Sequence, residues 1–419
     1  MTGTTFILLA ALFLLIAQWG AQTFLASLNR RYVLDRRDAV PPAFQGVVDL
    51  PTYQKSAEYT LARSRLGVAE SAWSLFVLLI LLPSPALSFS YTSITQTFGK
   101  GAWVEAAWLF SVVLLLSVPG LPWEWWLQFR LEERFGFNTT TQKIWWGDRL
   151  KGFLLSVILG FPLLWFILKL VDWVGPVWWL WAWALLMGFQ LLMMVIAPVI
   201  ILPLFNKLTP LPPGGLRDRL LQLGEKTGFS AQTILVMDGS KRSRHSNAFF
   251  TGFGRFRKIV LFDTLIQQLT VDELEAVLAH EIGHYKRGHV PRMLLANAVG
   301  TLVGFAVIAW LMRQPEFTGA FGFPLGTGLA PALLLFTVLS GAVTFWVAPL
   351  MNFWSRRHEY QADAYAATVL RNAGGLIGAL RKLNEKNLSN LTPHPWYSAW
   401  NYSHPTLLER EGALSGLKS

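Results

Sequence analysis

Seven long apolar runs constrain the fold of this chain more than any other feature of its sequence. Each run holds roughly the 20 apolar residues that a helix needs to cross the hydrocarbon core of a bilayer. Of the 419 residues, 53% are hydrophobic and only 15% are charged, a balance typical of membrane proteins. We therefore expect a mostly α-helical membrane protein with seven spans. The expected spans are residues 5–27, 68–92, 102–123, 152–172, 176–204, 293–313 and 328–350.

The first run is expected to remain in the mature protein, because it is too long for the core of a signal peptide and no basic segment precedes it. Prolines interrupt two other runs. Pro83 and Pro85 lie within the second, and Pro198 and Pro203 lie near the end of the fifth. Since proline removes a backbone donor, we expect kinks or re-entrant ends at these positions.

The basic residues predict how the chain is oriented in the membrane. An alternating path of seven spans leaves only Lys100, Lys169 and Arg313 on or near one side, and the other basic residues on the opposite side. Positive loops favour the cytosol, so we expect the N-terminus outside and the C-terminus inside. The net charge of +11 is explained by these loops, and we expect no nucleic-acid partner. The chain is expected in a bacterial inner membrane or the ER membrane.

Two large polar segments, residues 205–292 and 351–419, fall on the expected cytosolic side and contain all seven histidines. In the first segment, residues 216–227 predict a helix, and residues 233–237 and 258–262 predict strands. Residues 246–252 are expected to form an edge strand. The chemistry of this chain is therefore expected in these two segments.

One helix carries the pattern His280-Glu281-Ile282-Gly283-His284 after a capping box, Thr270 to Glu273. Residues four apart share a helix face, so both imidazoles can hold one ion, with Glu281 beside a water on that ion. The chain has no cysteine, so any metal ligands are nitrogen and oxygen atoms. The pattern predicts a catalytic zinc site, and the alternative is a pair of solvated helix histidines.

A catalytic zinc needs a third protein ligand, for which Glu359 is the best candidate. Glu359 and Asp363 are four apart on an expected helix, so they share a face. Asp363 would accept a hydrogen bond from the outer nitrogen of a ligand imidazole. His289 and His358 are rival ligands, although each fits the helical spacing less well.

Several further motifs accompany the two described above. The full set is Phe135-Gly136-Phe137-Asn138, Pro203-Leu204-Phe205-Asn206-Lys207, Ser246-Asn247-Ala248-Phe249-Phe250-Thr251-Gly252, the His280–His284 pattern, Glu359-Tyr360-Gln361-Ala362-Asp363 and Ser403-His404-Pro405. Together these motifs resemble the integral-membrane zinc metalloproteases of the CAAX-prenyl endopeptidase type (type I, a-factor-converting). The resemblance implies seven helices enclosing a hydrated chamber, with the zinc site near its cytosolic end. It implies endoproteolysis, including removal of the last three residues of prenylated CAAX proteins.

Roles for the remaining site residues follow from this chemistry. Glu281 would accept a proton from the attacking water and pass it to the leaving amine. The strand that contains Asn247, Ala248 and Phe249 would bind an extended substrate by strand addition. Asn247 alone fits a turn-capping role equally well, and the resemblance favours substrate binding.

Two C-terminal residues complete the expected site. A developing oxyanion needs a donor in addition to zinc, and the resemblance supports His404 in that role, whereas a lone histidine before proline fits a structural turn equally well. Arg410 is expected to pair with a carboxylate near the site, and its alternative is a surface charge.

These expectations describe a membrane domain combined with a gluzincin-like metalloprotease domain that has a small β-sheet and binds one Zn²⁺. The expected partners are the bilayer and a peptide or protein substrate, lipidated or not.

Two other functions remain open: a quality-control zinc protease for membrane proteins, and a non-enzymatic membrane protein with structural zinc. The expected divisions are residues 1–204 for spans one to five, 205–292 for the first protease part, 293–350 for the last two spans, and 351–419 for the second protease part.

Overall fold

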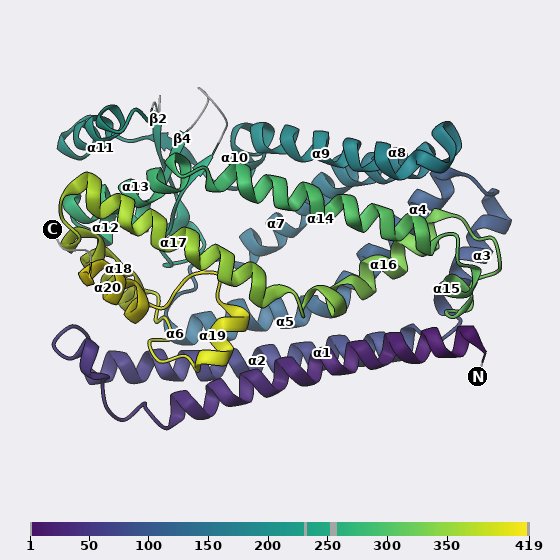
Figure 1. Ribbon diagram of the computed structural model, residues 1–419, viewed down its shortest axis with the longest axis horizontal. Helices are drawn as coiled ribbons and strands as arrows, with labels where there is room; N and C mark the ends of the chain where they lie inside the picture. Colours follow the sequence, from purple (N-terminus) through teal and green to yellow (C-terminus); the bar gives the residue numbers. More distant parts are fainter. Residues whose placement is uncertain (1, 230–232, 252–257, 417–419) are drawn as a thin grey trace.

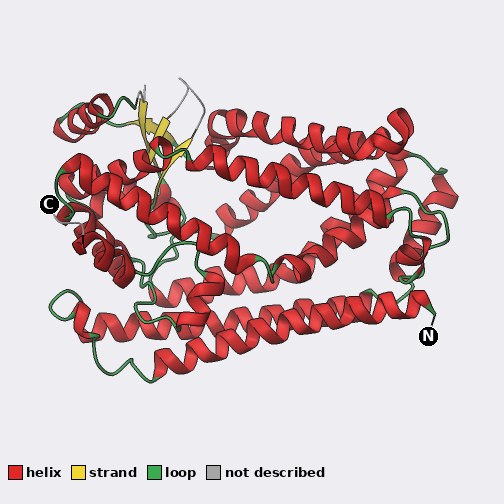
Figure 2. Cartoon of the chain, viewed as in Figure 1, coloured by secondary structure: helices red, strands yellow, loops and turns green. Residues whose placement is uncertain are grey.

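The computed structural model describes residues 2–229, 233–251 and 258–416. The fold is mostly helical, with one small sheet near the end of the molecule where the C-terminus lies (Figures 1 and 2). Long helices run roughly parallel to the longest axis of the molecule. The helices of the membrane part are α1 (Gly3–Leu34), α2 (Leu50–Leu81), α3 (Ala86–Phe98), α4 (Ala102–Ser117), α5 (Leu121–Trp126), α6 (Glu133–Phe135), α7 (Gln142–Leu155), α8 (Phe161–Val174), α9 (Trp178–Ile196), α10 (Leu202–Phe205), α14 (His289–Leu311), α15 (Pro315–Gly319) and α16 (Leu329–Thr344). Helix α17 (Ala348–Leu370) leads from α16 to the helices around the sheet.

Within the described residues, five helical stretches are long and apolar enough to cross a membrane, and six when the bent pair α16–α17 is taken as one span. This confirms a multi-span membrane protein. The expected number of seven stays a prediction, because the stretch Gln142–Phe205 is counted once although it contains two of the expected spans. Gly175, with a φ of 61°, lies within this stretch between α8 and α9. These two helices pack against each other.

The second expected span differs from the helix that forms. Helix α2 begins at Leu50, well before the predicted start at residue 68, and ends at Leu81. Asp49 caps its first turn by accepting a hydrogen bond from the backbone N–H of Thr52 at 2.9 Å. The expected break at Pro83 and Pro85 is confirmed, since α3 begins only after them.

The sheet contains four strands in the order β1-β2-β4-β3. Strands β2 and β4 match the two predicted strands and pair in parallel with each other. Strand β1, which was not predicted, pairs antiparallel with β2, and β3 pairs antiparallel with β4. The prediction of an edge strand is confirmed for β3, although Gly252 lies outside the described residues. The strands are β1 (Leu208–Pro210), β2 (Thr233–Met237), β3 (Ala248–Thr251) and β4 (Lys258–Phe262).

Helices around the sheet form a second hydrophobic core, which is separate from the first one among the membrane helices. Helix α13 packs against α17, α18 and α11, and the buried faces of α13 and α18 meet in this core. Helices α13 and α17 come close together at Gly283, where an added Cβ would lie 3.0 Å from the Cα and carbonyl oxygen of Ala362. The helices of this part are α11 (Gly215–Lys226), α12 (Asp263–Gln268), α13 (Val271–Lys286), α18 (Gly374–Lys386), α19 (Pro395–Asn401) and α20 (Leu407–Gly416).

Candidate metal centre

The start of α13 is fixed by the capping box that the sequence predicts. The hydroxyl of Thr270 accepts a hydrogen bond from the backbone N–H of Glu273, whose carboxylate accepts one from the N–H of Thr270. Buried apolar residues then hold one face of the helix against the second core. This packing leaves His280 and His284 on the face that meets α17.

Helix α17 brings Glu359 to the two histidines. One ligand atom from each of His280, His284 and Glu359 lies within 4.8 Å of the other two. His280 and Glu359 are buried, and His284 is partly buried. Helices from two polar segments of the chain, separated by α14, α15 and α16, therefore converge on one point.

The spacing of these atoms fits a metal ion. The Nε2 atoms of His280 and His284 are 3.2 Å apart, and the Glu359 oxygens lie 3.5 and 3.3 Å from them. A tetrahedral zinc ion with bonds of about 2.1 Å places its ligands about 3.4 Å apart. The Oε2 atom of Glu359 is buried without a hydrogen-bond partner among the described residues. An ion between the three side chains would satisfy this atom.

Asp363, one turn after Glu359, sets the tautomer of His280. Its Oδ1 lies 2.8 Å from Nδ1 of His280. Since a carboxylate only accepts, Nδ1 carries the proton and Nε2 presents a lone pair to the centre.

Arg410 on α20 holds Asp363 in place. Its Nε and Nη2 donate to the two carboxylate oxygens of Asp363 at 2.8 and 2.5 Å, and its Nη1 lies 3.7 Å from Glu359. Burial alone would lower the pKa of Arg410, but its bonds to Asp363 outweigh burial and raise it. The structure therefore places Arg410 in a buried ion pair and excludes the surface-charge alternative.

His289 contributes a contact that the sequence did not predict. The structure places it 3.0 Å from His284, Nδ1 to Nδ1, and its Nε2 lies 2.9 Å from Oε1 of Gln361. A neutral His289 donates to this oxygen through Nε2 and accepts at Nδ1, so His284 donates through Nδ1. The Nε2 of His284 then also presents a lone pair to the centre.

The two rival ligands thus lie outside the group formed by His280, His284 and Glu359. His289 and His358 stack on each other with centroids 4.1 Å apart. Neither belongs to the metal-binding group found among the described residues. The sequence does not predict the contact of His289 with Gln361, because Gln361 lies on another helix and no local pattern relates the two residues.

Glu281 is half-buried beside the two histidines. Among the described residues it has no hydrogen-bond or ion-pair partner, so its carboxylate remains available for a ligand or water. Burial is the largest influence on Glu281 and raises its pKa, although the neighbouring His280 and His284 oppose this. A carboxylate with a raised pKa is a better proton acceptor.

His404 reaches the centre from the segment between α19 and α20. Its Nε2 lies 3.4 Å from Oε1 of Glu359, while two-thirds of its side chain is exposed. Arg356 on α17 positions this segment by donating to the carbonyl oxygen of Tyr402 at 2.7 Å. The sequence held no signal for that role of Arg356.

The expected substrate strand lies beside α13. Ala248 and Phe249 belong to β3, which packs against α13 and, among the described strands, pairs with β4 alone. Asn247 precedes the strand and is exposed, and its Oδ1 accepts a hydrogen bond from the backbone N–H of Ala248 at 2.8 Å. This contact is local, to the residue that follows Asn247, and among the described residues the amide nitrogen of Asn247 makes no hydrogen bond.

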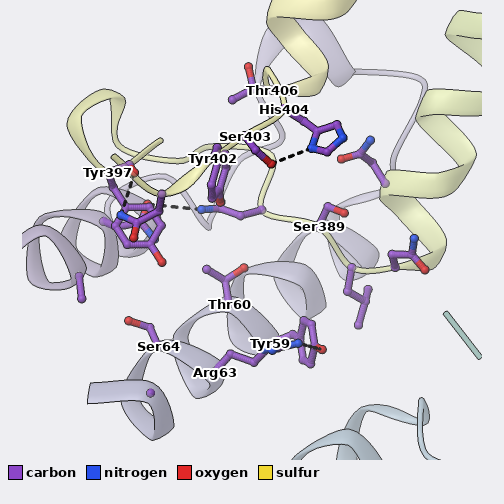
Figure 3. A pocket seen from close by; sticks show the side chains of 18 of the residues that line it. Tyr59, Thr60, Arg63, Ser64, Ser389, Tyr397, Tyr402, Ser403, His404 and Thr406 are labelled. Carbon is purple, nitrogen blue, oxygen red and sulfur yellow. Dashed lines mark hydrogen bonds between the residues drawn. The ribbon is translucent and has the colours of Figure 1, made fainter. Parts of the chain in front are cut away.

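A cavity of about 870 Å³ adjoins the centre and is lined by residues that include His404 and Arg410 (Figure 3). Figure 3 shows Tyr59, Thr60, Arg63 and Ser64 on one side of this cavity. The segment with Tyr397, Tyr402, Ser403, His404 and Thr406 lies on the other side. The volume of the cavity is in the range of pockets that enclose small ligands.

Known proteins match the chain over nearly its full length. Residues 29–207 match the family "CAAX prenyl protease N-terminal, five membrane helices", and residues 210–418 match peptidase family M48. CAAX prenyl protease 1 of Saccharomyces cerevisiae is 36% identical over 425 residues, which cover 95% of this chain and 93% of that protein. The CAAX prenyl protease 1 homolog of Arabidopsis thaliana is 36% identical over 390 residues, covering 90% of each.

A solved structure agrees with these matches. The crystal structure of S. mikatae Ste24p superposes with a TM-score of 0.89 at 32% identity and covers 99% of both chains. The likeness therefore includes the membrane helices as well as the part that contains the metal centre. The chain belongs to peptidase family M48 and is an integral membrane metalloprotease of the CAAX prenyl protease type.

Proposed function

We propose that this protein is a zinc endopeptidase in which His280, His284 and Glu359 hold one Zn²⁺. The observation that carries the proposal is the pair of Nε2 atoms 3.2 Å apart, with the carboxylate oxygens of Glu359 3.5 and 3.3 Å from them. Asp363 and His289 each fix one imidazole in the tautomer that leaves Nε2 unprotonated. Two lone pairs at this distance repel each other unless a cation lies between them.

The protein supplies the remaining groups for peptide hydrolysis. Bound zinc would polarise the scissile carbonyl and lower the pKa of a water molecule. Glu281 accepts the proton of the attacking water and returns it to the leaving amine. His404, which faces the cavity next to Glu359, donates a hydrogen bond to the oxyanion that develops on the carbonyl.

Substrate binding is assigned to the free edge of the sheet. An extended peptide adds to β3 through its backbone, and Asn247, Ala248 and Phe249 lie along that edge. The amide nitrogen of Asn247 donates to a substrate carbonyl. An extended backbone is also the conformation in which a peptide exposes a scissile carbonyl to a site beside the strand.

The catalytic part is divided in sequence, and we propose that both pieces face the cytosol. Residues 205–292 supply the sheet and α13, and residues 351–419 supply Glu359, Asp363 and Arg410. Residues 1–204 and 293–350 form the membrane part around an inner chamber. The distribution of Lys and Arg supports this orientation.

The proposed substrates are hydrophobic peptides of the CAAX type, prenylated or not, which are cut near the C-terminus. The support is the name that the relatives share, CAAX prenyl protease 1. Cleavage of one CAAX peptide in farnesylated and unmodified form, with and without a zinc chelator, tests the proposal. We expect cleavage that the chelator abolishes and added zinc restores, and the ratio of the two peptides shows whether the lipid is required.

The mechanism is tested by Glu281→Gln, which keeps the shape of the side chain but removes the proton acceptor. We expect full zinc content and a loss of activity of about 10²-fold or more. Glu225→Gln, at an exposed position on α11, is the matched control and should cleave at the wild-type rate. Wild-type activity in Glu281→Gln would contradict the mechanism. Preference for unfolded membrane proteins over short CAAX peptides would favour the quality-control alternative.

A further inference from the structure

The cavity beside the metal centre has an unbalanced charge. Among the described residues its lining contains no aspartate or glutamate, and most of the lining residues are polar, with five asparagines among them. Two arginines, Arg63 and Arg410, line it together with His245 and His404. A cavity with cations and without acidic side chains favours an anionic ligand.

Arg63 is the arginine that has donors left for such a ligand. Arg410 uses Nε and Nη2 for Asp363, as described above. Arg63, by contrast, makes its contacts through Nη1, which lies 3.0 Å from the hydroxyl of Tyr59 and 3.5 Å from Glu132. Its Nε and Nη2 make no hydrogen bond within the described residues, and half of its side chain is exposed.

The groups behind Arg63 hold it in position. Glu132 is buried, accepts a hydrogen bond from Tyr59 at 2.7 Å and lies 3.3 Å from His245. Phe137 stacks on the ring of His245 with centroids 4.0 Å apart. Glu132 does not line the cavity, so it orients the guanidinium of Arg63 without presenting a negative charge to a ligand.

We propose that this cavity binds the C-terminal carboxylate of the peptide substrate and that Arg63 is its anchor. The inference rests on the proposed function, in which the cut lies near the C-terminus. The substrate segment beyond the cut ends in a carboxylate, and three extended residues span about 10 Å. The planar guanidinium pairs with a carboxylate through two parallel hydrogen bonds, and its Nε and Nη2 are the pair that remains available.

This arrangement gives Arg63 a role in specificity. With the carboxylate fixed at Arg63 and the scissile carbonyl at the metal centre, the distance between the two sets how many residues are released. Figure 3 shows Arg63 on α2 on the opposite side of the cavity from His404, which we assign to the oxyanion. The substrate end would therefore extend across the cavity from His404 to α2.

The test compares one CAAX-type peptide as the free acid and as the C-terminal amide. For the full-length wild-type protein with zinc, we expect kcat/KM for the acid to exceed that for the amide by about 10- to 100-fold, mainly through KM. In Arg63→Gln this preference should fall to about one, and Arg63→Lys should restore part of it. Arg65→Gln is the matched control, because Arg65 is an exposed arginine on the same helix that does not line the cavity. It should retain the wild-type preference.

The possible outcomes separate this inference from the proposed function. Equal cleavage of acid and amide by the wild type, or a full preference in Arg63→Gln, would overturn the carboxylate site and leave the protease intact. An equal loss on both peptides in Arg63→Gln would also overturn it, because that result indicates a structural role or an anionic lipid at Arg63. Cleavage of neither peptide by the wild type would overturn the proposed function and this inference with it.

Discussion

Asp363 accepts a hydrogen bond from Nδ1 of His280 at 2.8 Å, and through this contact one helix orients a ligand on another. The same carboxylate binds Arg410, so three elements, α13, α17 and α20, are fixed relative to one another at one buried point. The metal centre is therefore supported by an ion pair whose partners come from the second polar segment of the chain.

Replacement of Asp363 by alanine should weaken zinc binding by about 10- to 100-fold, the usual effect of losing the hydrogen-bond partner of a ligand histidine. It also leaves Arg410 buried without its carboxylate, next to His280. Zinc affinity can be measured by competition with a chelator. Asp218→Asn, at an exposed position on α11, serves as the control. Wild-type affinity in the alanine variant would show that Asp363 does not orient the ligand.

Variants of His289 should separate its hydrogen bond from its bulk. His289→Leu removes the acceptor for Nδ1 of His284, and we expect zinc affinity to fall about 10-fold. His289→Asn keeps an oxygen near the position of Nδ1 and should recover most of that loss. The same competition assay measures both variants. Equal affinities in the two would contradict the assigned chain from His284 through His289 to Gln361.

Substitution of Gly283 by alanine should destabilise the protein, because the new methyl group would lie 3.0 Å from backbone atoms of Ala362. Overpacking of this kind costs about 1–3 kcal/mol. Thermal unfolding in detergent measures the loss, and Gly300→Ala is the control, since a Cβ at Gly300 meets no atom within 4 Å. We also expect weaker zinc binding, because Gly283 lies between the ligand-bearing helices. An unchanged melting temperature in Gly283→Ala would contradict this account of the contact.

The capping box of α13 predicts a dependence of stability on pH. Burial alone would raise the pKa of Glu273, but hydrogen bonds from Lys382 and Thr270 outweigh it and lower the pKa. When the pKa of a carboxyl group is lower in the folded state, its ionised form stabilises the protein at pH values above the unfolded-state pKa. This stabilisation is lost as the pH falls through the folded-state pKa. The difference in melting temperature between wild type and Glu273→Gln should therefore be constant near neutral pH and shrink below about pH 4.5. A constant difference down to pH 3.5 would argue against this role.

Local spacing was sufficient to predict the elements that carry the metal centre. The four-residue interval between His280 and His284 places both on one helix face, and the same interval relates Glu359 to Asp363. The strands β2 and β4 were predicted because β-branched and apolar residues dominate them. These signals depend on neighbours along the chain, which the sequence displays directly.

Several features that depend on distant contacts were not predicted. The polar first part of α2 gives no hydropathy signal, and its Tyr59 and Ser56 bond to Glu132 and Ser389, far away in the chain. Strand β1 is three residues long and forms only by pairing with β2. The contact of His289 with Gln361 and the position of Arg63 in the cavity likewise require the assembled fold.

The separation of the ligands along the chain determines when the centre can form during biosynthesis. His280 and His284 leave the ribosome before α14 and α16 have been made, and Glu359 follows both helices. A nascent chain therefore cannot complete the metal centre until its last apolar segment has been synthesised. Metal loading is thus a late event, and a growing chain has no competent protease while its own membrane insertion is still in progress.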